Sequence, residues 1–249
     1  MRNFKKPLLF SAAMLPVIIP AVVLTAFYQI QLYPADAVNQ LGSKAALIIL
    51  SAVQGSLLVA VCCFFGYILA DKTGLWIPLY IERDKLFKTI ALASSAGLVF
   101  SLDYWTFGTC EPLIQSSITG AGLSAAGFGA AVLYGGIAEE ILMRLFLMSL
   151  ISFILWKLFC RSTPKNKLPD IIFIAANIIS TLLFAAGHLP ATAAAFGELT
   201  PMLLARCFLL NGGFGLLFGR LYHRYGIWYS IAAHMLVHIV SKAVWLILI

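Results

Sequence analysis

The chain has 249 residues, of which 61% are hydrophobic and only 11% are charged. A soluble domain carries about a quarter charged residues, so this composition excludes an ordinary soluble protein. The net charge of +7 then reports on membrane topology, because Lys and Arg gather in cytoplasmic loops. We expect the lipid bilayer as the main partner and no nucleic acid.

Seven apolar stretches approach or exceed the roughly 20 residues that a membrane-spanning helix needs. The first runs from Leu8 to Leu32, followed by the small-residue triplet Ala35-Asp36-Ala37. It is longer than the apolar part of a signal peptide, so we expect an uncleaved helix. The predicted spans are 8–32, 45–70, 87–108, 124–156, 171–188, 203–222 and 227–249. The predicted fold class is an all-α, polytopic transmembrane helical bundle.

Basic residues fall mainly in alternate connecting segments. Segments 1–7, 71–88, 157–170 and 220–226 together hold 13 of the 17 Lys and Arg residues. The intervening segments hold Lys44 and Arg206 alone. This asymmetry predicts a cytoplasmic N-terminus and an outer C-terminus. Between the second and third spans, residues 71–86 mix Trp, Pro and Tyr with charges, which suits an interfacial loop or a short surface helix.

The fourth span carries two adjacent acids, Glu139 and Glu140, with Arg144 four residues further on. An acidic residue at mid-helix costs about 2.5–3.5 kcal/mol to insert, so we expect a functional site here. Residues four apart share a helix face, which makes Glu140 and Arg144 partners and leaves Glu139 facing elsewhere. The span is roughly 50 Å long against a bilayer core of about 30 Å, so we expect it to break, tilt or project.

Three of the four histidines, His188, His234 and His238, lie within predicted spans. We expect them to share a polar site with Glu139. The pair His234 and His238 has the spacing that can chelate a metal or donate hydrogen bonds to an oxyanion. Counted along the helices, His234 lies about 10 Å deep and His188 about 26 Å deep. The fifth helix must therefore begin outside the membrane or tilt strongly if these side chains are to meet.

Three motifs occur in order along the second half of the chain. Glu139-Glu140-Ile141-Leu142-Met143-Arg144 matches EExxxR, and Phe184-Ala185-Ala186-Gly187-His188 matches FxxxH. A glycine-rich helix, the loop at Tyr225-Gly226 and then His234 follow. Together these motifs resemble the type II CAAX-protease-like family, also called the CAAX protease and bacteriocin-processing (Abi) family. The similarity covers about residues 124–242, which predicts N-terminal helices and an interfacial loop over 1–123 and a catalytic membrane core over 124–249.

The resemblance implies an integral-membrane endopeptidase that acts on a peptide or protein substrate. It implies that Glu139 activates a water, His188 positions that water and His234 faces the oxyanion, with Glu140 and Arg144 in support. The family's asparagine at the next helical turn is His238 here, and imidazole still donates a hydrogen bond. The family is described both as metal-dependent and as metal-free, which leaves the cofactor open between none and a divalent metal such as zinc. Bacterial relatives suggest the plasma membrane of a bacterium.

Two other functions fit the same residues. A non-catalytic membrane scaffold or bacteriocin-immunity protein would keep the fold without the activity, and His238 in place of asparagine favours this interpretation. A proton-coupled transporter would use the same intramembrane Glu and His residues. The absence of a visible inverted repeat argues against transport.

Overall fold

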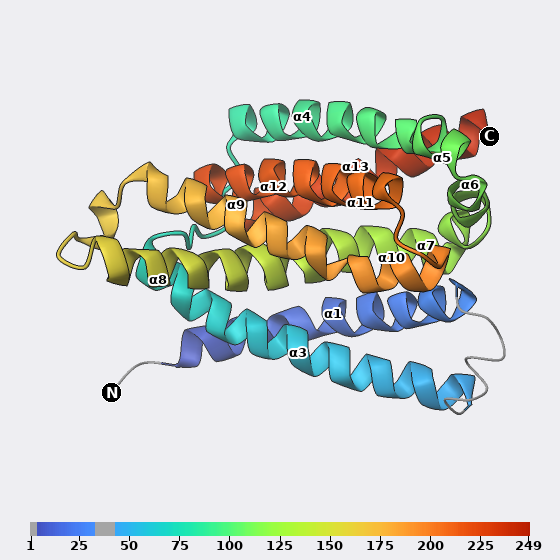
Figure 1. Cartoon of the computed structure of the whole chain (residues 1–249). Coiled ribbons are helices and arrows are strands. Elements are labelled where there is room, and N and C mark those ends of the chain that lie inside the picture. Colours follow the sequence, from blue (N-terminus) through green and yellow to red (C-terminus); the bar gives the residue numbers. More distant parts are fainter. Residues whose placement is uncertain (1–3, 33–42) are drawn as a thin grey trace.

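The computed structural model describes residues 4–32 and 43–249, and every regular element within them is a helix (Figure 1). Arg2 and the triplet Ala35-Asp36-Ala37 lie outside the described residues. Seven helices in the described ranges are long and apolar enough to cross a membrane: Lys5–Gln31, Lys44–Thr73, Arg83–Cys110, Ala125–Phe159, Asp170–Phe196, Pro201–Tyr225 and Ile227–Leu248. The predicted all-helical, seven-span architecture is confirmed, and the chain is an integral, multi-pass membrane protein.

The helices follow one another in this order. The first three spans are α1 (Lys5–Leu32), α3 (Lys44–Thr73) and α4 (Arg83–Ser101), which leads through η1 (Leu102–Tyr104) to α5 (Phe107–Cys110), α6 (Pro112–Thr119) and η2 (Ala121–Leu123). The fourth span comprises α7 (Ala125–Gly129), η3 (Ala130–Glu139), η4 (Ile141–Met148) and α8 (Ser149–Phe159). After η5 (Lys165–Lys167) come α9 (Asp170–Gly187), α10 (Leu189–Phe196), α11 (Pro201–Cys207), η6 (Phe208–Gly212), α12 (Gly213–Tyr225) and α13 (Ile227–Leu248).

The fourth span is one unbroken helix that carries wide, π-type winding. This winding covers Ala130–Glu139 and Ile141–Met148, on either side of Glu140. Long π segments are rare, and π-bulges within α-helices are frequently found at functional sites. Of the three possibilities expected for this long span, a break is absent, and the backbone is locally rewound on both sides of Glu140.

The segment predicted as interfacial, 71–86, is only partly a loop. Its first residues complete α3 and its last residues begin α4, so the irregular part runs from Gly74 to Glu82. The hydroxyl of Tyr229 on α13 accepts from the Glu82 backbone N–H at 2.9 Å and donates to the Tyr80 carbonyl at 3.0 Å. These bonds fix the loop against the start of the last helix.

The fourth span lies between two sets of helices. The pair α1 and α3 packs along the fourth span on one side, while α13 packs on η3, α4 and α12 (Figure 1). In Figure 1, α5, α6, α7 and α10 gather at one end of the bundle, opposite the connection between α8 and α9. The contact between η3 and α13 is close because Gly136 has no side chain. A Cβ atom there would lie 3.1 Å from the Met235 Cα and N atoms and closer still to its Cγ.

We expect the substitution Gly136→Ala to lower the stability of the bundle by about 1–3 kcal/mol, the usual effect of overpacking. The added methyl meets the backbone of Met235, which cannot move without moving α13. Thermal unfolding in detergent measures the effect. Gly213→Ala is the matched control because a Cβ at Gly213 meets nothing within 4 Å. Equal unfolding temperatures for the two variants would contradict this account of the helix contact.

Candidate functional site

A cavity of about 380 Å³ lies inside the bundle. It is lined by residues of α1, η3, α9, α10, α12 and α13, among others. The structure places Glu139, His188, His234 and His238 on its wall. The structure thus brings these four side chains together in one cavity, while Glu140 and Arg144 are buried, each 1% exposed.

Glu139 and His188 lie close together on the cavity wall. The Nε2 atom of His188 lies 3.8 Å from Oε1 of Glu139, and both side chains are partly exposed. The other ring nitrogen, Nδ1, lies 2.9 Å from the carbonyl oxygen of Phe184. Since a carbonyl only accepts, Nδ1 carries the hydrogen, and a neutral His188 presents a lone pair at Nε2. Two acceptors at this separation suit a water molecule that donates one hydrogen to each.

The two histidines meet the acidic pair although they lie at different distances along their helices. His188 follows the end of α9, whereas His234 is only seven residues into α13. The first residues of α9 and α13 lie at the same end of the bundle. Asp170 at the start of α9 pairs with Arg224 at the end of α12, 3.0 Å away, and α13 begins directly after α12. Figure 1 shows α9 descending obliquely across α12 toward α10. This slant brings His188 to Glu139, and it is one of the two arrangements expected for the fifth helix.

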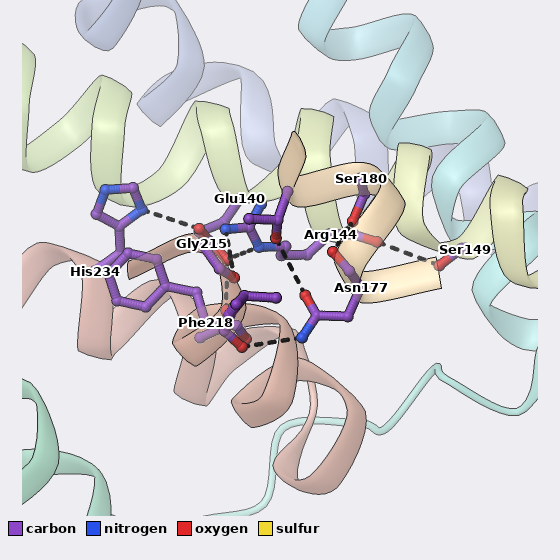
Figure 2. Close-up of polar contacts among 11 residues, drawn as sticks. Glu140, Arg144, Ser149, Asn177, Ser180, Gly215, Phe218 and His234 are labelled. Atoms are coloured by element: carbon purple, nitrogen blue, oxygen red, sulfur yellow. Dashed lines mark hydrogen bonds and ion pairs between the residues drawn. The ribbon is translucent and has the colours of Figure 1, made fainter. Parts of the chain in front are cut away.

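Glu140 is the centre of a buried network that joins three helices (Figure 2). Its Oε1 accepts from Nδ1 of His234 at 2.9 Å, and its Oε2 accepts from the hydroxyl of Ser230 at 2.5 Å. The Nε atom of Arg144 lies 3.6 Å from the same Oε2. The predicted partnership of Glu140 and Arg144 is thus present in the structure. The bonds to Ser230 and His234 were missed, although these residues share a face of α13 four residues apart.

The orientation of His234 follows from its bond to Glu140. A carboxylate only accepts, so Nδ1 carries the hydrogen and Nε2 is directed away from Glu140. Neutral His234 therefore presents a lone pair at Nε2, and only its imidazolium form presents an N–H there. Phe218 stacks on the ring with centroids 4.2 Å apart and planes 18° apart. Glu140 and Phe218 together hold the imidazole in one orientation.

The charged side chain of Arg144 is buried in the protein. Its Nη2 donates to the carbonyl of Gly215 at 3.1 Å, and its guanidinium lies 5.4 Å from the ring centroid of Phe184. Among the described residues its Nε and Nη1 atoms have no hydrogen-bond partner. The main compensation for this buried cation is therefore the carboxylate of Glu140.

His238 occupies space that a glycine leaves open. Its ring stacks on that of His234 with centroids 5.0 Å apart, and no hydrogen bond to its ring nitrogens is present within the described part of the chain. A Cβ atom on Gly135 would lie only 3.0 Å from Nε2 of His238. The imidazole fits at this position because Gly135 carries no side chain.

The candidate residues do not form a metal site. In residues 4–32 and 43–249, no group of three or more His, Cys, Asp or Glu side chains is arranged to hold a metal ion. Zinc sites in proteins use three or four such ligands around one point. His234 and His238 instead lie ring against ring, 29° from parallel. The residues present therefore fit water activation by side chains better than zinc binding.

Three charged residues on the cavity wall were not assigned a role from the sequence. Asp103 and Arg206 form a two-pronged ion pair, with Nε to Oδ1 at 2.8 Å and Nη2 to Oδ2 at 2.6 Å. Lys242 is buried on α13, two helical turns beyond His234. Together with Gln29 and Ser117 they extend the cavity toward the end of the bundle where α5, α6 and α10 gather.

We expect Ser230→Ala to lower the stability of the protein by about 1.5–3 kcal/mol, the cost of removing a hydrogen bond to a charged group. Its hydroxyl lies 2.5 Å from the buried carboxylate of Glu140 and 2.9 Å from the carbonyl of Phe218, and its single hydrogen is donated to the closer, charged acceptor. Ser241→Ala is the control, because this equally buried hydroxyl bonds only the His238 carbonyl one turn earlier in its own helix. Denaturant titration in detergent compares the two. A loss no greater in the Ser230 variant than in the control would rule out a strong bond to Glu140.

Comparison with protein families gives a match in the second half of the chain. The family model described as type II CAAX prenyl endopeptidase Rce1-like matches residues 121–240. This range begins at η2, ends within α13 and includes Glu139, Glu140, Arg144, His188, His234 and His238. No curated protein and no solved structure matches the chain. The resemblance seen in the motifs is confirmed over the matched residues.

Proposed function

Because residues 121–240 belong to the Rce1-like family of type II CAAX prenyl endopeptidases, we propose that the protein hydrolyses a peptide bond of a membrane-associated protein or peptide. The observation that carries the proposal is the facing pair Glu139 and His188, with Oε1 and Nε2 3.8 Å apart on a cavity wall. A carboxylate and an imidazole that both accept from one water molecule are the groups that activate it for attack.

In the proposed reaction the water donates one hydrogen to Glu139 and the other to His188. Glu139 takes the proton as the oxygen attacks the carbonyl carbon of the scissile bond, and a tetrahedral oxyanion forms. The C–N bond then breaks, and the proton passes from Glu139 to the leaving amine. Each proton taken from the water is thus accounted for, and the side chains return to their starting state.

Two histidines on α13, His234 and His238, stabilise the oxyanion. His234 supports it as an imidazolium, since only that form has an N–H at Nε2 while Nδ1 bonds Glu140. Carboxylates that hold a histidine in place and stabilise its cation are established in hydrolase sites. His238, stacked beside it, supplies a second donor in place of the family's asparagine. Glu140, Arg144 and Ser230 are positioning residues in this scheme.

We further propose that the N-terminus is cytoplasmic, that residues 1–123 form a supporting unit for the core at 124–249, and that the membrane is the plasma membrane of a bacterium. The basic segments support the orientation. In this orientation the cavity reaches toward the outer end of the bundle, where Gln29, Ser117 and Arg206 line it. Substrate would then approach from the bilayer or from the outer side.

A second candidate is a non-catalytic scaffold or immunity protein of the same fold. The observation that favours it is His238, which lacks a hydrogen bond to its ring among the described residues and replaces the family's asparagine. Such a protein would keep its biological effect when Glu139 is changed.

The proposal is tested with purified protein in detergent and a library of quenched, membrane-anchored peptides, with and without a chelator. Cleavage by the wild type that is lost in Glu139→Gln supports the proposed role of Glu139. Cleavage that persists in the variant removes Glu139 as the base. Loss of wild-type activity with chelator would contradict the metal-free scheme, and no cleavage by either protein would favour the scaffold.

A further inference from the structure

An asparagine on the cavity wall has a bonded nitrogen and an open oxygen. Asn211 lies on η6, which borders the cavity and has π-type winding like η3. Its Nδ2 donates to the carbonyl of Cys207 at 3.0 Å, one turn earlier in the same helix. In the described ranges its Oδ1 accepts from no group, and this oxygen is not enclosed by the protein. The scheme for peptide hydrolysis leaves this side chain without a role.

The contacts with Cys207 determine which way the amide of Asn211 is directed. A carbonyl oxygen only accepts, so the amide nitrogen points toward Cys207 and Oδ1 points away from it. The sulfur of Cys207, a weak acceptor 3.5 Å from the same nitrogen, takes up the second hydrogen. Both donors of the amide are thus engaged within its own helix. The group that remains for a ligand is an acceptor held in one orientation.

Asn211 lies within a short distance of the reacting groups. The thiol of Cys207 donates to the carbonyl of Ala185 on α9 at 3.2 Å. Asn211 follows Cys207 by one turn, and His188 follows Ala185 by about one turn. A turn rises about 5.4 Å, so two turns separate Asn211 from His188 by at most roughly 11 Å along the bundle. An extended peptide advances about 3.3 Å per residue, and three residues span this distance.

A peptide that enters the cavity needs acceptors for its backbone N–H groups. The wall is rich in aromatic rings, among them Phe184, Phe214 and Phe218, and an N–H that leaves water without a new partner costs free energy. The other carboxamide on the wall, Gln29, is exposed near the end of α1. The amide oxygen of Asn211 carries no charge that would select an ionic side chain. It fits the N–H that every residue except proline has.

We propose that Oδ1 of Asn211 accepts a hydrogen bond from a backbone N–H of the peptide substrate, within three residues of the scissile bond. This inference rests on the proposed peptidase function and adds a substrate-binding residue to it. The contact holds the main chain of the substrate without reading its side chains. It also requires that this part of the peptide be extended, because N–H groups inside a helix are already bonded to its own carbonyls.

The test replaces amides of a membrane-anchored peptide by esters, one at a time, over three residues on either side of an unchanged scissile amide. An ester has no N–H, so at one position Oδ1 is left without its donor. For the wild type we expect kcat/KM to fall roughly 5- to 50-fold at that position. Asn211→Leu keeps the size of the side chain without the acceptor, and it cleaves the amide and the ester equally. Gln29→Met removes the other carboxamide of the wall and keeps the wild-type ratio.

A second variant covers the loss of the bond to Cys207. Asn211→Ser has a hydroxyl that can donate to the carbonyl one turn earlier, but it is too short to replace Oδ1 in the cavity. We expect it to lose the ester effect as Asn211→Leu does. Since the readout is a ratio of two substrates for each variant, a general loss of activity does not change it.

The outcomes separate this inference from the proposed function. If no ester lowered kcat/KM of the wild type, the contact would be overturned and the peptidase would stand. An ester effect of undiminished size in both Asn211 variants would assign the N–H to another acceptor. A lower rate for amide and ester alike, with their ratio unchanged, would leave Asn211 a structural role only. Cleavage of no peptide by the wild type would remove the peptidase function itself, and the contact with it.

Discussion

The variant Glu139→Gln is expected to cleave peptide about 10²- to 10⁴-fold more slowly than the wild type while it unfolds at the same temperature. Loss of a general base has an effect of this size. The effect on stability is small because Glu139 is partly exposed to the cavity and its contact with His188, at 3.8 Å, is longer than a hydrogen bond. Glutamine keeps the shape of the side chain but cannot take a proton from water. Single-turnover cleavage and thermal unfolding in detergent measure the two quantities.

The neighbouring acid provides the matched comparison. Glu140→Gln has the same change in chemistry one residue further on, but Glu140 is 1% exposed and bonds His234 and Ser230. We expect this variant to lose stability because Arg144 is left without its counter-charge. If both variants lost activity and stability to the same extent, the separate roles of the two glutamates would be refuted.

The second large effect is expected in Arg144→Leu, which should destabilise the protein by about 3–5 kcal/mol. Removal of one partner of a buried ion pair leaves an uncompensated charge, and changes of this kind have costs of this size. Here the charge that remains is Glu140, which is completely enclosed. Denaturant or thermal unfolding in a mild detergent measures the loss, provided that unfolding is reversible.

A double variant distinguishes the lost ion pair from lost packing. Arg144→Leu combined with Glu140→Leu removes both charges, and replacement of both partners by apolar groups is often tolerated. We expect the double variant to be more stable than Arg144→Leu alone. Purely additive losses would show that packing of the Arg144 side chain, for instance on Phe184, accounts for the effect.

The seven spans could be predicted because long apolar runs identify membrane helices without knowledge of their neighbours. The pairing of Glu140 with Arg144 could also be predicted without knowledge of neighbouring helices, because it depends only on the spacing of residues within one helix. Contacts between helices were harder to predict from the sequence, because they depend on how the helices are tilted and rotated against one another. The approach of His188 to Glu139 depends on the slant of α9 (Figure 1), whereas the sequence indicated only that the fifth helix must begin outside the membrane or tilt strongly.

The bond between His234 and Glu140 was missed because it depends on how α13 is rotated against η3. That rotation is set by Gly136, whose contact with the Met235 backbone fixes the two helices at close range. The π winding was missed as well, since apolar periodicity does not distinguish it from an ordinary helix. The family resemblance suggested which residues to examine, whereas their hydrogen bonds required the structure.

The fit between Gly135 and His238 links the fourth span to the ring pair on α13. A methyl group at position 135 would lie 3.0 Å from Nε2 of the imidazole and 3.3 Å from its Cδ2. The imidazole would then have to move by a few tenths of an ångström, and because it stacks on His234, the movement would be passed on to that ring. A single hydrogen atom on the fourth span thus sets how the two imidazoles lie against each other.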